Sequence, residues 1–148
     1  GGYCVGSAAL IRYLRYYSRP YFFSTSLPAP VVAGLIEVFK LLRDDQAGRR
    51  QLWKNIRYLK SHLDNAGFDT GDSRSGIIPI IVGDEQKLAL FHNDLRHAGV
   101  FTNIVTYPAV RRKECRLRLS VMQSLTQDDM DRALSQITRL GRAHGVIA

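Results

Sequence analysis

The segment Arg116–Val121 alternates polar and apolar side chains, and it constrains the fold more than any other stretch. Successive side chains of a strand point to opposite faces. One face therefore carries only apolar side chains and the other only polar ones: Leu117, Leu119 and Val121 against Arg116, Arg118 and Ser120. Because the apolar face must be covered, the segment predicts a sheet with helices packed on one side.

Hydrophobic periodicity supplies those helices. Helices are predicted over residues 7–17, 30–42, 49–66 and 85–98 and from Thr126 onward, and strands over 77–82, 100–106 and 116–121. Pro20 is expected to end the first helix, and Pro79 indicates an edge or a bulge. Thr126 and Asp129 form an acidic variant of the capping box. The fold class predicted is α/β: a small, largely antiparallel sheet with helices on one face, preceded by long helices.

Composition limits the classes of function. The chain has 148 residues, 45% of them hydrophobic, which suits one compact domain. The net charge of +8 comes from scattered basic residues rather than one basic stripe, so we interpret it as a solvated surface and not as a nucleic-acid interface. No stretch is long and apolar enough to span a bilayer. Cys4 and Cys115 lie far apart in sequence, which favours a reduced, cytoplasmic protein.

Arg118 is the first candidate for a functional residue. A guanidinium on a rigid strand can hold a carboxylate with two parallel hydrogen bonds. The hypothesis is that Arg118 binds a substrate carboxylate. The alternative is that it lies on a solvated strand face, and the pattern alone favours this alternative.

The second candidate is the segment Tyr21–Pro30, in which aromatic residues lead into Ser24, Thr25 and Ser26 and then into a proline pair. Hydroxyl groups just ahead of a helix suit an anion, because the first turn of a helix offers unpaired N–H donors. They equally suit simple capping of that helix by Thr25 or Ser26. Position alone leaves both interpretations open.

Several stretches, in this order, resemble the α-oxoamine synthases of the pyridoxal-phosphate-dependent fold-type-I class. The family includes 8-amino-7-oxononanoate synthase, glycine C-acetyltransferase, 5-aminolevulinate synthase and serine palmitoyltransferase. The matching stretches are Gly1–Tyr3, Arg19–Pro28, Gly67–Gly71, Ile78–Asp84, and Tyr107–Val110 leading to Arg116–Ser120. Each stretch is weak alone, and the ordered set is specific.

The resemblance implies a reaction and its cofactor. Pyridoxal 5'-phosphate would act as the electron sink for an amino acid. The amino acid would attack an acyl-CoA or an acyl-carrier thioester and lose carbon dioxide, which leaves an α-amino ketone. Such an acyltransferase would be a homodimer without a membrane span and without a nucleic-acid partner.

The resemblance also assigns residues. Arg118 matches the family position that binds the amino-acid carboxylate. Ser24, Thr25 and Ser26 match the segment that reaches the cofactor phosphate of the neighbouring subunit, with Thr25 favoured. Residues Leu119–Met122 look closer to serine palmitoyltransferase, whereas the closing residues 145–148 look like the end of the ketobutyrate ligase, so the subfamily stays open. Leu125 stands where the family usually has a histidine.

The family's Schiff-base lysine would precede Gly1, and no lysine of this chain matches it. The expectation is therefore a piece of a longer chain, with no catalytic residue of its own. Residues 1–27 would end the large cofactor domain, 28–66 would be connecting helices, and 67–148 would form the C-terminal small domain. The alternative is a non-catalytic subunit that keeps the fold and the dimer interface without the lysine.

Overall fold

The computed structural model describes residues 3–148, and Gly1 and Gly2 of the first matching stretch lie outside the described residues. The chain divides into two units, Gly1–Asp44 and Asp45–Ala148, and each is described by itself. In the described part, no helix has the length and apolar character needed to cross a membrane. The predicted domain limits at residues 27 and 66 stay predictions.

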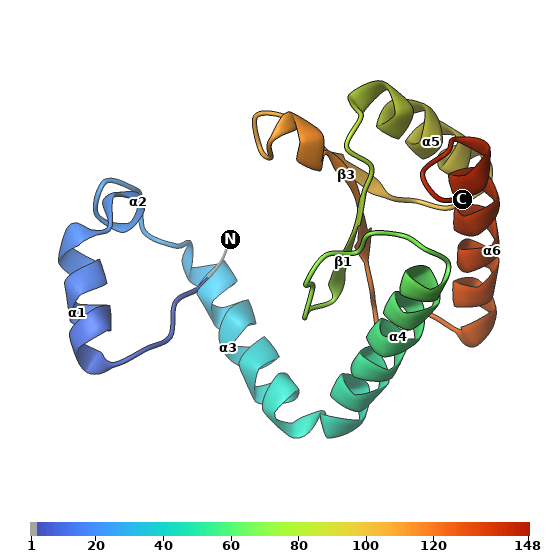
Figure 1. Cartoon of the computed structure of the whole chain (residues 1–148). Helices are drawn as coiled ribbons and strands as arrows, with labels where there is room; N and C mark the ends of the chain where they lie inside the picture. Colours follow the sequence, from blue (N-terminus) through green and yellow to red (C-terminus); the bar gives the residue numbers. More distant parts are fainter. Residues whose placement is uncertain (1–2) are drawn as a thin grey trace. The chain divides into compact units, whose positions relative to one another are not determined.

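The first unit consists of helices (Figure 1). They are α1 (Ala8–Tyr17), α2 (Arg19–Phe22) and α3 (Ala29–Asp44). Ser7 caps α1 as its hydroxyl accepts the N–H of Leu10 at 3.2 Å. The prediction that Pro20 ends the first helix was wrong: α1 ends at Tyr17, and Pro20 lies in the first turn of α2. Proline lacks the N–H that a first turn leaves unpaired anyway, so it fits there without cost.

The first unit has no buried residue of its own among those described. The predicted apolar stripe of α3 is present, and its members are all exposed: Val31, Leu35, Val38 and Leu42. Aromatic contacts are local, such as the stacking of Tyr13 on Tyr17 with ring centroids 4.6 Å apart. A helix with an uncovered apolar face is typical of a surface that another segment or chain covers.

The second unit contains the sheet and its covering helices. Its elements are α4 (Gln46–Asn65), β1 (Ile77–Ile81), α5 (Glu85–His97), β2 (Asn103–Val105), a 3₁₀ turn (Arg112–Glu114), β3 (Arg116–Ser120) and α6 (Gln127–Ala143). Asp45 starts α4 by accepting the N–H of Gly48 at 2.8 Å. Gly67, with φ of 94°, ends it in the left-handed region, where a side chain would be strained.

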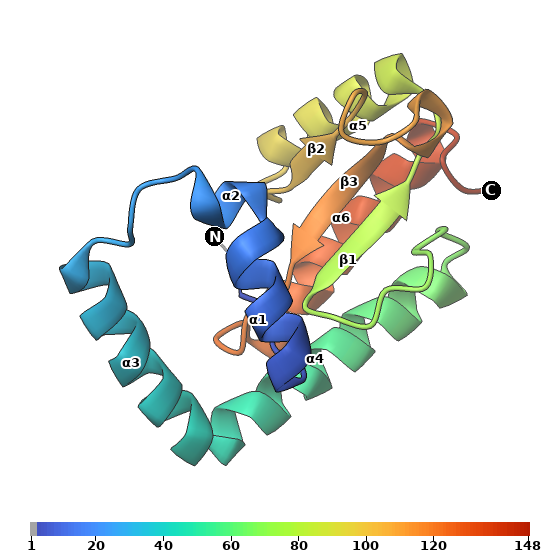
Figure 2. The ribbon, with the colours of Figure 1, turned by 90° about the vertical axis from the view of Figure 1, so that its left-hand side faces the viewer.

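The three strands form an antiparallel sheet in the order β1-β3-β2. Figure 2 shows the sheet in front of α4, α5 and α6. Pro79 lies on edge strand β1, as predicted, opposite Arg118. The N–H of Ile81 points away from β3 to the carbonyl of Asp69 at 2.9 Å. Since N–H groups alternate along a strand, the absent N–H of Pro79 would also have pointed outward, so proline removes no bond to β3.

The core lies between one face of the sheet and the helices, as the alternation in β3 predicts. Its strand members are Ile78, Ile80, Leu117, Leu119 and Val121, and its helix members include Ile56, Leu59, Leu63, Leu88, Phe91, Leu95, Leu134 and Ile137. The other face of the sheet has no helix of this unit against it (Figure 2). The α/β fold class and the antiparallel sheet are thus confirmed. The predicted strand 100–106 was too long, because only residues 103–105 pair with β3.

The capping box at the start of α6 generates a prediction about stability. The Thr126 hydroxyl donates to the Asp129 carboxylate at 2.6 Å, and the Asp129 N–H donates back to that hydroxyl at 3.2 Å. Bonds from the Thr126 hydroxyl and backbone, and then from Arg132, lower the pKa of Asp129. A lowered pKa stabilises the fold above the unfolded-state pKa, and this part is lost as pH falls through the folded-state pKa.

We expect Thr126→Ala to lower the free energy of unfolding by about 1 kcal/mol at neutral pH, and by less once the pH has fallen below the lowered folded-state pKa of Asp129, where the carboxyl is protonated. Thr126→Ser keeps the hydroxyl and should change little. Urea unfolding followed by circular dichroism measures both. An equal loss for the serine variant, or a difference that does not narrow in acid, would contradict this account.

Candidate functional site

Arg118 lies at the centre of the open face of the sheet, which is the face that no helix of the second unit covers. It belongs to the middle strand, with Pro79 of β1 and Asn103 of β2 directly opposite it. Its side chain is exposed. In residues 3–148 no carboxylate and no carbonyl pairs with its guanidinium. All five donors of the group are therefore available to a ligand.

Arg116 occupies the same face and behaves differently. Its Nε donates to the carbonyl of Glu114 at 2.7 Å, and its Nη2 lies 3.5 Å from the Glu114 carboxylate. The side chain is 24% exposed. Arg116 thus holds the turn before β3, and Arg118 is the arginine of the pair that can bind a ligand.

A basic loop leads into this strand. Tyr107–Pro108 is a cis peptide. The guanidinium carbon of Arg112 lies 4.8 Å from the centroid of the Tyr107 ring, and its Nη1 lies 3.6 Å from the Glu85 carboxylate. These contacts tie the loop both to itself and to the first turn of α5.

The hydroxyl segment Ser24–Ser26 belongs to the first unit and is exposed and non-helical. Helix α3 begins after it, at Ala29, and the first N–H groups of α3, those of Val31 and Val32, bond to the Pro28 carbonyl. No hydroxyl of Ser24, Thr25 or Ser26 caps the helix, and these side chains have no hydrogen bond in the described part of the chain. The capping interpretation therefore fails, and the three hydroxyls are available to an anion. Arg118 belongs to the other unit.

Asn55 supports the site and was missed by the sequence analysis. It is 1% exposed, on the core side of α4. Its amide N–H₂ group donates to the carbonyls of Met122, Gln123 and Leu125 at 3.0 to 3.4 Å, and its oxygen accepts from Gln51 at 2.8 Å. It thereby fixes the segment that follows β3. The available signal was a polar residue within the apolar stripe of α4.

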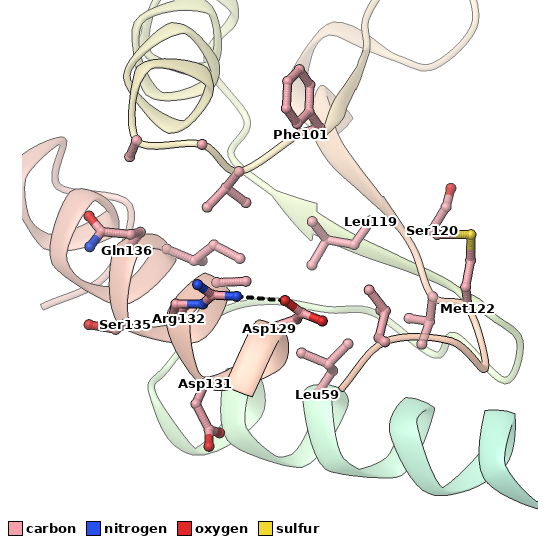
Figure 3. A pocket seen from close by; sticks show the side chains of 17 residues that line it. Leu59, Phe101, Leu119, Ser120, Met122, Asp129, Asp131, Arg132, Ser135 and Gln136 are labelled. Carbon is pink, nitrogen blue, oxygen red and sulfur yellow. Dashed lines mark hydrogen bonds and ion pairs between the residues drawn. The ribbon is translucent and has the colours of Figure 1, made fainter. Parts of the chain in front are cut away.

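A cavity of about 910 Å³ lies beside this segment, on the helix side of the sheet (Figure 3). Its walls come from the end of β3, residues 98–101 and α6. At its rim, Nη2 of Arg132 lies 2.7 Å from Oδ1 of Asp129. Asp129 is already engaged by the cap of α6, and none of the residues predicted to bind substrate or cofactor lines the cavity. The cavity is therefore separate from the candidate site.

Ionisable groups elsewhere in the unit do not supply a catalyst. Burial raises the pKa of the Cys115 thiol, so it stays protonated and is a weak nucleophile at neutral pH. The hydroxyl of Tyr58 donates to Asp131 at 2.5 Å, and this bond raises the pKa of Tyr58. The described residues thus offer binding groups, Arg118 and the hydroxyl segment, rather than an activated base or nucleophile.

Comparison with known proteins identifies a family. Residues 1–137 match the family described as aminotransferase class I and II. The chain is 39% identical to 8-amino-7-oxononanoate synthase of Thermoanaerobacter pseudethanolicus, over 99% of this chain and 37% of the relative. It is 41% identical to 4-hydroxy-2,2'-bipyrrole-5-methanol synthase of a Serratia strain, over 90% of this chain and 20% of the relative.

Solved structures agree with these relatives. Serine palmitoyltransferase of Sphingomonas wittichii matches with a TM-score of 0.78 and 31% identity, over 98% of this chain and 37% of that protein. A serine palmitoyltransferase variant from S. paucimobilis with bound PLP matches with a TM-score of 0.79 and 30% identity, over 92% of this chain and 35% of that protein. The resemblance to the α-oxoamine synthases is confirmed. The chain spans a little over a third of the length of the first of these relatives.

The role of Asn55 can be tested on this chain. We expect Asn55→Ala to lower the free energy of unfolding by about 1 to 3 kcal/mol, because three backbone carbonyls lose the buried amide that donates to them. Gln51→Ala removes only the exposed partner of Asn55 and should cost much less. Urea unfolding measures both changes. Equal losses for the two variants would mean that Asn55 does not hold the segment after β3.

Proposed function

The chain belongs to the aminotransferase class I and II family, and we propose that it is the substrate-clamping part of an α-oxoamine synthase. The whole enzyme would condense an amino acid with an acyl-CoA or an acyl-carrier thioester, with loss of carbon dioxide, to give an α-amino ketone. The observation that carries the proposal is the unpaired Arg118 at the centre of the open sheet face. The similarity to 8-amino-7-oxononanoate synthases over 99% of this chain supports it.

Arg118 is suited to bind the amino-acid carboxylate. The group is held by a strand that is paired on both sides, so its position is fixed by the sheet rather than by a flexible loop. A planar guanidinium matches the two oxygens of a carboxylate and stays charged at every physiological pH. Arg116, bonded to Glu114, leaves Arg118 as the one to meet the substrate.

The hydroxyl segment fits the phosphate of pyridoxal 5'-phosphate. Thr25, with Ser24 and Ser26 beside it, presents hydroxyl donors that no other described group uses. Phosphate oxygens accept such donors readily. When bound, the cofactor supplies an electron sink for the amino acid. Among the groups that would hold the cofactor, the described residues offer the phosphate contact.

The exposed apolar face of α3 supports assembly as a homodimer. Val31, Leu35 and Val38 are each close to half exposed, although they form the apolar stripe of a sixteen-residue helix. We propose that the rest of the enzyme and a second subunit cover this face, and that Thr25 reaches the cofactor of that second subunit.

The exposed thiol of Cys4 and the buried thiol of Cys115 are both free, which favours a reducing cytoplasm.

Borohydride reduction of the full-length protein tests the proposal and its alternative. Reduction converts a lysine–cofactor Schiff base into a stable covalent adduct. We expect the intact mass to rise by one pyridoxyl phosphate group. An unchanged mass would contradict the proposal that the protein is an active enzyme. The alternative, a non-catalytic subunit that keeps the fold without the lysine, would then remain.

Replacement of Arg118 should weaken amino-acid binding. We expect Arg118→Ala in the full-length enzyme to raise the dissociation constant of glycine or L-serine by roughly 30-fold or more, about 2 kcal/mol, because the carboxylate loses its charged partner. Titration followed by the absorbance of the bound cofactor measures it. Arg139→Ala removes an exposed arginine of α6 and serves as the control. Unchanged affinity in the Arg118 variant would remove this role.

Replacement of Thr25 should weaken cofactor retention. Thr25→Val keeps the shape of the side chain and removes its hydroxyl, so we expect faster loss of pyridoxal phosphate on dialysis. Thr25→Ser keeps the donor and should retain the cofactor nearly as well as the parent. Cofactor content after dialysis, read from absorbance, is the measurement. Equal retention by the valine variant would mean that the hydroxyl does not contact the phosphate.

A further inference from the structure

The loop before β3 concentrates positive charge. Residues 111–118 contain five basic side chains and one acidic side chain. Arg111, Arg112 and Lys113 are consecutive and exposed. This run, which we call the basic loop, is the densest group of cations in the chain, and the proposed binding of the amino acid uses none of its members.

Two cations of the basic loop have no anionic partner in residues 3–148. Arg112 pairs with Glu85, and Arg116 pairs with Glu114. The remaining nearby carboxylate, Asp84, accepts the N–H of Lys87 at 2.7 Å as the cap of α5. Arg111 and Lys113 are left unpaired, although acidic groups lie on the neighbouring helix. Their charges are therefore available to an outside anion.

The base of the loop is held by the fold. The N–H groups of Val82 and Gly83 both donate to the Cys115 carbonyl, at 3.0 and 3.1 Å. The guanidinium of Arg112 contacts both the Tyr107 ring and the Glu85 carboxylate. Anchoring reduces the entropy that the loop would lose when it binds a ligand.

The loop lies on the same side of the sheet as Arg118. In Figure 1 the orange turn projects to the side of the sheet that α6 does not cover. Arg118 comes six positions after Arg112, so no more than about 20 Å of extended chain lies between them. A ligand that is anionic at one end and reactive at the other can reach both places.

We propose that Arg111 and Lys113 bind the phosphate groups of a coenzyme A acyl donor whose thioester lies beside the amino acid held by Arg118. The inference rests on the proposed function and adds the site of the donor. Coenzyme A carries its phosphates close together at one end of a long arm and the thioester at the other. Two unpaired cations two positions apart in one short loop suit such clustered phosphates, and a single carrier-protein phosphate would use them less fully.

The test compares two double variants of the full-length enzyme loaded with its cofactor. Arg111→Gln/Lys113→Gln removes two charges from the basic loop. Lys54→Gln/Arg57→Gln removes the same two charges from the exposed face of α4 and is the matched control. Isothermal titration with coenzyme A and with pantetheine, at low and high salt, measures the dissociation constants.

We expect the loop variant to bind coenzyme A roughly tenfold more weakly and with less dependence on salt, while pantetheine, which has no phosphate, binds as to the parent. The control variant should bind both as the parent does. An equal loss in the control would mean that net charge alone attracts coenzyme A, and it would overturn the assignment. Unchanged binding of coenzyme A by the loop variant would also overturn the assignment. This includes the outcome in which the variant loses only its use of an acyl group delivered by a carrier protein.

Cofactor absorbance and glycine affinity, read in the same preparations, separate this inference from the proposed function. If both are normal and the loop variant binds coenzyme A like the parent, only the phosphate site is wrong. If the parent enzyme binds neither the cofactor nor coenzyme A, both proposals fail.

Discussion

The one-sided burial of strand β3 is the constraint on which the second unit depends. Leu117 and Leu119 are buried among the helices, and the residue between them must therefore face the other way. A shift of one residue in the pairing with β1 and β2 would bury Arg118 and expose two leucines. Burying an unpaired guanidinium is strongly unfavourable, whereas burying apolar side chains is favourable. Only one register of β3 is therefore stable. The same register places the free arginine at the middle of the open face.

The pairing of charges along β3 separates two roles that the sequence presents as equal. Arg116 and Arg118 share a face, a strand and a residue type. Arg116 reaches back to Glu114, which comes just before the strand, and closes the preceding turn. Arg118, flanked by Pro79 and Asn103, has no acidic neighbour in the ladder. Only the three-dimensional neighbours decide which arginine is structural and which is left for a ligand.

Local sequence patterns predicted most of the helices and strands. They failed where one pattern is compatible with two different local structures. The alternation in β3, the capping box at Thr126 and the glycine after α4 each have one physical interpretation, and the structure has all three. Proline, by contrast, both ends helices and begins them, and Pro20 begins one. The position of Arg118 followed from alternation alone. Two features could not be predicted from local patterns. The role of Asn55 depends on carbonyls that are distant in sequence. The free hydroxyls of residues 24–26 depend on the exact residue at which α3 begins.

The first unit lacks the packing that helices of its length need. Its helices are capped and amphipathic, yet no described side chain in it is buried. Helices of this length gain most of their stability from packing rather than from propensity. The free energy that orders α3 must therefore come from surfaces outside the first unit, and the hydroxyls of residues 24–26 directly precede that helix. Under the proposed function, a contact between Thr25 and a cofactor phosphate would depend on assembly, because a second subunit would have to cover the apolar face of the helix that follows Thr25.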